Sequence, residues 1–208
     1  TMNSVTEYGE FDEKFQETYE LFKRNIESDE EVGASFAVYK DGKPIIDLYG
    51  GFQDRDKKIS WNKDTLVNVH STSKGIVAMV VAKLIDNGDL ELDKRVCDYW
   101  PEFSENGKND IKVKTLLSHQ AGLYGWREPL DETDFYKWDY VCELLAKQKP
   151  FHEPNEEICY HPKTIGFLVG ELIKRITKKS VGKNLHELLS NPLDAKCFIG
   201  TPEIYHNN

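Results

Sequence analysis

Residues 65–89 read TLVNVHSTSKGIVAMVVAKLIDNGD, and this stretch decides the fold of the 208-residue chain. A β-rich segment at 66–70 leads into Ser-Thr-Ser-Lys at 71–74, where an apolar run begins. The run at 75–87 is apolar nearly all round, so we predict a buried helix rather than a surface helix. The Asn-Gly-Asp at its end predicts the helix terminus, because glycine accepts the left-handed conformation that closes a helix.

The serine and lysine of this stretch form a candidate nucleophilic pair. Ser71 and Lys74 are three residues apart, so on a helix they share one face and can hydrogen-bond. A serine hydroxyl is a poor nucleophile until a neighbouring base takes its proton, and a lysine can be that base when its pKa is lowered. In the first turn of the helix, Ser71 would also bring free backbone N–H groups to the reacting atoms. The structural alternative is that Ser71 only caps the helix.

The composition is that of a folded globular protein that does not bind nucleic acid. Hydrophobic residues make up 39% of the chain and aromatic residues 12%, which is ample material for a core. The formal net charge is −9 at pH 7, with no basic cluster large enough to offset it, so neither nucleic acid nor an anionic membrane is expected as a partner. There is no charged-then-apolar leader and no run of about 18 apolar residues. A cytoplasmic location is therefore predicted, although a targeting segment that had been removed would leave no trace.

The cysteines and histidines do not suggest a metal site. The four cysteines are widely spaced and form neither a C-x-x-C pair nor a zinc spacing with the six histidines: Cys97, Cys142, Cys159 and Cys197. Free thiols in a reducing compartment are the expectation, with Cys159 as a reactive thiol near a site as the alternative. We predict no cofactor, either metal or organic.

The rest of the chain alternates between short strand and helix signals. An aromatic stripe at helical spacing predicts a helix over 10–27: Phe11, Phe15, Tyr19, Phe22 and Ile26. Strands at 34–40 and 43–50 flank Asp41-Gly42, a hairpin turn. The chain is thus expected to begin helix, strand, strand. Further helices are expected near 113–118, 140–147, 164–177 and 185–189.

Four landmarks occur in a fixed order along the chain. They are STSK at 71–74, NGDLELD at 87–93 followed by WPEF at 100–103, TLLSHQAGL at 115–123, and YHP at 160–162. Together they resemble the serine β-lactamase-like family, which includes penicillin-binding proteins, class C β-lactamases and their esterase relatives. The resemblance implies an α+β, β-lactamase/transpeptidase-like fold, in which an antiparallel sheet flanked by helices meets a helical region.

The resemblance also implies an organisation in three parts. Residues 9–60 would be an N-terminal helix and hairpin, 61–200 a mainly helical region with the S-x-x-K and Tyr motifs, and 201–208 the start of a further part. The fold would be incomplete at the C-terminus, because no K-T-G-like or H-x-G-like strand follows. A second polypeptide would complete it, or the chain is a fragment. Expressed alone, it is expected to expose apolar surface and to associate, with a homo-oligomer as one outcome.

Roles for individual residues follow from the same resemblance. Ser71 would be the acyl-forming nucleophile, with its backbone N–H as half of an oxyanion hole, and Lys74 its proton partner. Tyr160 would be a second acid/base group that activates water for deacylation; a core tyrosine is the alternative. His70 and His161 adjoin the nucleophile and this tyrosine in the chain, so we predict that they bind substrate, with filling of space as the alternative.

Other polar residues near these motifs receive no catalytic role. The family gives His119 a structural turn role rather than that of a base. Glu153, Glu156 and Glu157 precede the tyrosine motif and are expected to form a solvated loop.

The sequence departs from the family at the third position of the Y-x-N motif, where Pro162 stands in place of asparagine. A side-chain amide that would hydrogen-bond an acylamide substrate is therefore absent, which favours an ester. We predict a serine hydrolase, most simply an esterase, that acts on small-molecule ester or amide substrates through an acyl-enzyme. Two alternatives stay open: a non-catalytic scaffold for binding or self-assembly, and a true β-lactamase or D-Ala peptidase.

Overall fold

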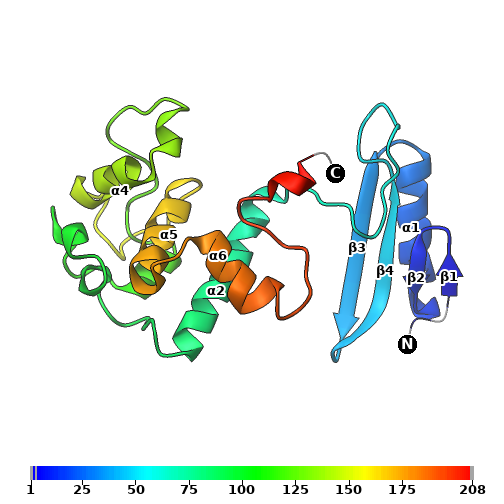
Figure 1. Cartoon of the computed structure of the whole chain (residues 1–208), viewed down its shortest axis with the longest axis horizontal. Coiled ribbons are helices and arrows are strands. Elements are labelled where there is room, and N and C mark those ends of the chain that lie inside the picture. The colour runs from blue at the N-terminus through cyan, green and yellow to red at the C-terminus, as the bar shows by residue number, and fades with distance from the viewer. Residues whose placement is uncertain (1, 3, 207–208) are drawn as a thin grey trace. The chain divides into compact units, whose positions relative to one another are not determined.

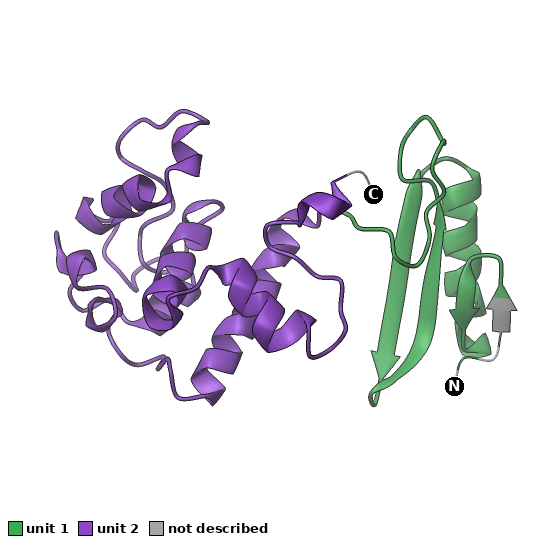
Figure 2. Cartoon of the chain, in the orientation of Figure 1, with its two compact units in different colours: residues 1–67, 207–208 green, residues 68–206 purple. Residues whose placement is uncertain are grey.

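A computed structural model describes residue 2 and residues 4–206. The chain forms two compact units, the first ending at Val67 and the second running from Asn68 to His206 (Figures 1 and 2). The sequence suggested a domain boundary after residue 60. In the structure the boundary between the two units comes slightly later, after Val67.

The first unit contains an antiparallel four-stranded sheet in the order β1-β2-β4-β3. Its strands are β1 (Ser4–Thr6), β2 (Gly9–Phe11), β3 (Gly33–Lys40) and β4 (Lys43–Gly51). The long pair β3–β4 confirms the predicted hairpin. It turns at Asp41 (φ 53°) and Gly42 (φ 72°), two successive left-handed residues as a tight hairpin turn requires.

The predicted order helix, strand, strand is wrong at its start, because β1 and β2 precede the helix. Helix α1 (Gln16–Glu27) begins later than residue 10, after a 3-10 turn capped by Asp12, whose side chain accepts the Lys14 N–H. Phe11 therefore belongs to β2, where it pairs with Ile46 of β4. It still joins the core that the aromatic stripe predicted, since its ring stacks on Tyr19 of α1 at 4.8 Å between centroids.

The second unit is helical and has its own core. Its helices are α2 (Ser73–Asp86), α3 (Val113–Leu117), α4 (Trp138–Lys147), α5 (Thr164–Thr177) and α6 (Val181–Leu185), which continues as a π-helical turn over His186–Ser190. These elements confirm the predicted helices, although the last of them starts earlier than residue 185. Fully buried side chains from α2, α4 and α5 meet in the core, among them Leu84, Leu145 and Leu168.

The prediction that α2 is buried is wrong for one side of this helix in the second unit. Val80, Val81 and Leu84 face the core, whereas Met79 is 49% exposed and the neighbouring alanine Ala78 is also exposed. An all-round apolar helix needs cover on every side, and the described residues of the second unit supply it on one side only. Among the described residues, none of the helices has both the length and the apolar character needed to cross a bilayer.

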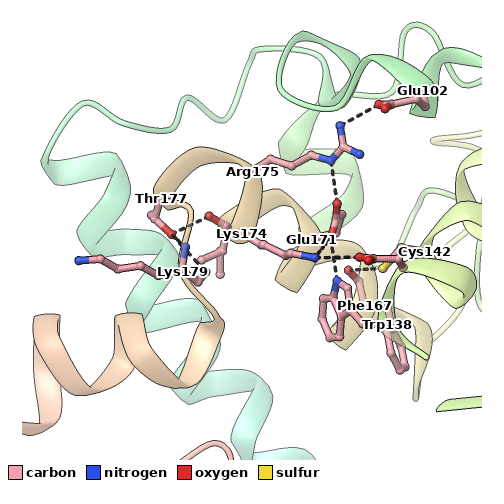
Figure 3. A network of polar contacts seen from close by, with 11 residues as sticks. Glu102, Trp138, Cys142, Phe167, Glu171, Lys174, Arg175, Thr177 and Lys179 are labelled. Atoms are coloured by element: carbon pink, nitrogen blue, oxygen red, sulfur yellow. Dashed lines mark hydrogen bonds and ion pairs between the residues drawn. The ribbon is translucent and has the colours of Figure 1, made fainter. Parts of the chain in front are cut away.

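A buried carboxylate joins α5 to the elements beside it (Figure 3). Glu171, 6% exposed, accepts hydrogen bonds from Trp138 Nε1 at 2.7 Å and Arg175 Nε at 2.8 Å. Arg175 also donates to Glu102 at 2.7 Å, and Lys174 donates to Asp139 of α4 at 2.8 Å. A buried charge is tolerated only when it is paired and hydrogen-bonded, so this network fixes α5 against α4.

Candidate active site

Ser71 lies at a sharp entry into α2. A 3-10 turn, His70–Thr72, precedes the helix, and His70 has a left-handed backbone (φ 47°). The His70 N–H donates to Asn68 Oδ1 at 2.9 Å, and the Thr72 N–H donates to Val69 O at 3.1 Å. These local bonds turn the chain into the helix and leave the Ser71 side chain exposed at the start of the second unit.

Two groups donate hydrogen bonds to the Ser71 hydroxyl oxygen. Lys74 Nζ lies 3.0 Å from Ser71 Oγ, which confirms that the pair shares a helix face. Tyr160 Oη, 89 residues away in the chain, lies 2.8 Å from the same oxygen. Lys74 Nζ is also 5.0 Å from the centre of the Tyr160 ring. The structure thus brings together the three residues that the sequence singled out for catalysis.

The electrostatics of this trio act on the Tyr160 phenol. Hydrogen bonding with Lys74, followed by hydrogen bonding with Ser71, lowers the pKa of Tyr160 below the ordinary value of a tyrosine. The Tyr160 side chain is half exposed, so burial opposes this shift only weakly. The arrangement therefore favours proton exchange between Tyr160 and Ser71.

The segment that carries Tyr160 is tied by hydrogen bonds to the landmark at 115–123. The Phe151 N–H donates to Gly122 O at 2.8 Å, and the Asn155 N–H donates to Gln120 O at 3.0 Å. Gly122 is left-handed (φ 67°), and a Cβ there would lie 2.6 Å from a backbone oxygen, so only glycine fits. The landmark is therefore a docking edge for the Tyr160 segment.

Asn155 is a residue of this docking edge that the sequence analysis did not single out. Thr115 Oγ1 donates to Asn155 Oδ1 at 2.7 Å, and Asn155 is itself left-handed (φ 71°). An asparagine tolerates this conformation better than most residues, which is the only signal that could have found it.

The two histidines predicted to bind substrate lie in different surroundings. His70 is exposed, directly before the nucleophile. His161 is fully buried, and both of its ring nitrogens are used: Nε2 accepts the Leu123 N–H at 3.0 Å and Nδ1 donates to Cys159 O. This geometry favours a structural role for His161, which was the alternative, over contact with substrate.

His119 has the turn geometry that the resemblance implied. It is left-handed (φ 62°), and its carbonyl oxygen and Nδ1 accept the N–H groups of Cys159 and His161, each at 3.0 Å. The glutamates Glu153, Glu156 and Glu157 are exposed, as expected for a solvated loop.

An open apolar cavity of about 460 Å³ runs along α2 and α5. Lys74, His70 and His119 line it together with apolar side chains such as Val77 and Val169. Among the residues that the structure describes, no group of three or more His, Cys, Asp or Glu side chains is arranged to hold a metal ion.

Comparison with known proteins identifies relatives of the chain. The profile of a protein family described as Beta-lactamase matches residues 20–204. Esterase/beta-lactamase LipL of Mycobacterium tuberculosis is 35% identical over 162 residues, which cover 78% of this chain and 37% of that protein.

Solved structures show the same relationship. A family VIII carboxylesterase superposes with a TM-score of 0.89 at 39% identity, over 99% of this chain and 55% of the other. A penicillin-binding protein homologue from Caulobacter crescentus superposes with a TM-score of 0.90 at 35% identity, over 99% of this chain and 54% of the other. The chain therefore spans about half the length of these structures. Because the family profile matches most of the chain, residues 20–204, the chain belongs to the beta-lactamase family and has its β-lactamase/transpeptidase-like fold.

Proposed function

We propose that this protein is a serine hydrolase that cleaves small esters through an acyl-enzyme on Ser71. One observation carries the proposal: Ser71 Oγ is within hydrogen-bond distance of both Lys74 Nζ and Tyr160 Oη. A nucleophile beside two groups that can exchange its proton is the arrangement that acyl transfer requires.

The acylation step uses all three side chains. Ser71 Oγ forms a bond to the carbonyl carbon of the ester while its proton passes to Lys74, with Tyr160 as the neighbouring proton carrier. The bond to the leaving alcohol then breaks, and the alcohol oxygen takes up a proton from the same pair. The backbone N–H of Ser71 is the proposed donor to the developing oxyanion.

Deacylation returns the free serine. Tyr160 would remove a proton from the attacking water, because hydrogen bonding with Lys74 and Ser71 lowers its pKa and so favours the phenolate. The acyl–Ser71 bond breaks, the acid product leaves, and the serine oxygen takes back a proton.

Pro162 supports esters rather than β-lactams as substrates. It occupies the position two residues after Tyr160, is exposed, and has neither a side-chain amide nor a backbone N–H to donate to an acylamide. The names of the relatives also support this preference, since a family VIII carboxylesterase is 39% identical to the chain. LipL is named for both activities, so β-lactam hydrolysis is the second candidate.

Variants of Ser71 test the proposal directly. Ser71→Ala should abolish hydrolysis of p-nitrophenyl butyrate in the complete protein, whereas the matched control Ser73→Ala, two residues along the same turn, should retain most of it. Undiminished hydrolysis by Ser71→Ala would remove Ser71 as the nucleophile.

A ranking of substrates separates the two candidate activities. The proposal expects p-nitrophenyl butyrate to be turned over with a much higher kcat/KM than nitrocefin. The reverse ranking would make β-lactam hydrolysis the better assignment.

A further inference from the structure

Two imidazole rings hold the main chain on either side of Tyr160. We infer that His161 and His119 are positioning residues, which fix the two peptide groups next to Tyr160 and thereby direct its phenol to Ser71. The inference rests on the proposed function, and it adds a task to two residues whose ring nitrogens hydrogen-bond to the main chain.

His161 fixes the peptide group before Tyr160. Its Nδ1–H donates to the carbonyl oxygen of Cys159, which belongs to the Cys159–Tyr160 peptide. Its Nε2 accepts the Leu123 N–H at 3.0 Å, so the ring connects this peptide group to the docking edge at 115–123. Both bonds are inside the protein, where a hydrogen bond to a fully buried imidazole is not exchanged with water.

His119 fixes the peptide group after Tyr160. Its Nδ1 accepts the His161 N–H at 3.0 Å, which belongs to the Tyr160–His161 peptide. Its carbonyl oxygen accepts the Cys159 N–H, also at 3.0 Å. These hydrogen bonds restrain both peptide groups that flank Tyr160, and with them the direction in which its side chain leaves the backbone.

The ring of Tyr160 is half exposed, which explains why hydrogen bonds to its main chain are needed to position it. Half of this side chain lies in solvent. Lys74 Nζ lies 5.0 Å from the centre of its ring, and the His119 ring centroid lies 5.1 Å from that of Tyr160. Packing therefore constrains the ring on one side only. The distance of 2.8 Å between Tyr160 Oη and Ser71 Oγ therefore depends on where the main chain holds residue 160, and a displacement of about 1 Å is enough to cost a catalytic group most of its effect.

The hydrogen bonds require both imidazoles to be neutral, and the surroundings favour that form. Burial lowers the pKa of His161 to about 4, so this ring is neutral at any moderate pH. Burial, followed by the charge of Lys74, lowers the pKa of His119. His152 also faces His161, and its effect on the pKa has the same sign.

Two amide variants of His161 separate its two hydrogen bonds in the complete protein. In His161→Asn the amide nitrogen can replace Nδ1 and donate to Cys159 O, whereas in His161→Gln the amide oxygen can replace Nε2 and accept the Leu123 N–H. We expect His161→Gln to lower kcat for p-nitrophenyl butyrate about 10–100-fold with little change in KM, and His161→Asn to retain more of kcat. Equal kcat in the two variants, or losses that only follow thermal stability, would overturn the inference.

A spectroscopic measurement keeps this test separate from the proposed activity. In protein with ¹³Cζ-labelled tyrosine, the Tyr160 resonance is identified with Tyr160→Phe, and its titration is followed by NMR. Because Lys74 and Ser71 lower the pKa of Tyr160, displacement of the ring in His161→Gln should raise that pKa toward the ordinary tyrosine value. An unchanged pKa would overturn the inference, whereas a wild-type protein without esterase activity would overturn only the proposed function.

His119 offers a second pair of variants if the His161 variants do not fold. Asparagine tolerates the left-handed backbone of residue 119 and can place Oδ1 near the position of Nδ1, whereas alanine has no acceptor there. We expect His119→Asn to keep more of kcat than His119→Ala. The opposite order would contradict a positioning role for the imidazole nitrogen.

Discussion

Ser71 Oγ accepts two hydrogen bonds, one from Lys74 Nζ and one from Tyr160 Oη, and this shared oxygen organises the chemistry at the scale of single residues. Lys74 also acts on the second partner of the nucleophile, since its hydrogen bonding is the largest cause of the lowered pKa of Tyr160. Loss of Lys74 should therefore affect both partners of the serine.

Lys74→Ala should reduce the rate of acylation by at least about 10²-fold, because it removes the proton partner of Ser71. The same change should raise the pKa of Tyr160, since hydrogen bonding with Lys74 is what lowers it most. Any limb of the pH–rate profile that reports the Tyr160 phenolate should then move to higher pH. Burst kinetics with p-nitrophenyl acetate between pH 6 and 10 measure both effects.

Lys83→Ala is the matched control for this prediction. Lys83 lies on the same helix and pairs with Asp86 at the exposed end of α2. Its loss should leave the acylation rate and the pH profile unchanged. If Lys74→Ala acylates at a near-normal rate, the proton must go to another group, and Tyr160 is the first candidate.

The candidate trio could be predicted from sequence, whereas the contacts of its neighbours could not. Ser71 and Lys74 share a helix face by spacing alone, and the order of the motifs assigned Tyr160. His161 was placed with the substrate-binding residues because it adjoins Tyr160 in the chain, yet its ring is buried and points to Leu123 and Cys159. Adjacency in sequence does not fix the direction of a side chain in an irregular segment.

At the scale of elements, local signals predicted the helices well and the short strands poorly. The hairpin β3–β4 was predictable because Asp41-Gly42 is a local turn signal. Strands β1 and β2 have three residues each, and β2 pairs with β4, more than 30 residues away in the chain. No local sequence pattern therefore predicts β2. Phe11 fits the helical spacing of the aromatic stripe by coincidence, although Asp12 could have been recognised as the cap of the turn that precedes the helix.

Helix α5 depends on the buried carboxylate of Glu171. Glu171→Ala should lower the free energy of unfolding by about 3 kcal/mol, because Trp138 Nε1 and Arg175 would lose their shared acceptor in a buried place. Urea denaturation followed by circular dichroism measures this change. The control Glu143→Ala removes an exposed pair with Lys147 on α4 and should have little effect. Equal losses in both variants would show that the network adds no stability.

Lys108 is a buried cation at the end of α4. It is fully buried, and its Nζ donates to the carbonyl oxygens of Glu105 at 2.6 Å and Gln148 at 2.5 Å. Burial lowers the pKa of Lys108 to about 8, below the ordinary lysine value of about 10.4. Between these two values the unfolded chain holds a proton that the folded chain has released.

This difference in proton binding predicts a pH dependence of stability. The contribution of Lys108 is present above the unfolded pKa and is lost as the pH falls through about 8, so stability should rise with pH over this window. Lys108→Met removes the titrating group and should abolish that rise. Urea unfolding at pH 7, 8.5 and 10 compares the two proteins, and parallel pH profiles would contradict the assignment.

At the scale of the whole molecule, several large apolar side chains are exposed to solvent. The cavity of about 460 Å³ along α2 and α5 is open, and Met79 and Val67 are among the exposed apolar residues. The family relatives are about twice as long as this chain, and the sequence-based expectation of uncovered apolar surface agrees with the exposure of α2.

The 208-residue chain expressed by itself should therefore associate. We expect its apparent mass in size-exclusion chromatography with light scattering to increase with concentration, and we expect it to enhance ANS fluorescence, because large exposed apolar patches drive both. Ala78→Lys, on the exposed side of α2, should reduce the association without altering the core. A strictly monomeric chain without ANS binding would contradict this prediction.

The central claim is that Ser71 is a nucleophile activated by Lys74 and Tyr160. Its most direct test is intact mass spectrometry of the complete protein after incubation with a fluorophosphonate, followed by peptide mapping of the adduct. We expect a single adduct on Ser71, absent in Ser71→Ala and strongly reduced in Lys74→Ala. An adduct on another residue, or no adduct on a folded and complete protein, would contradict it.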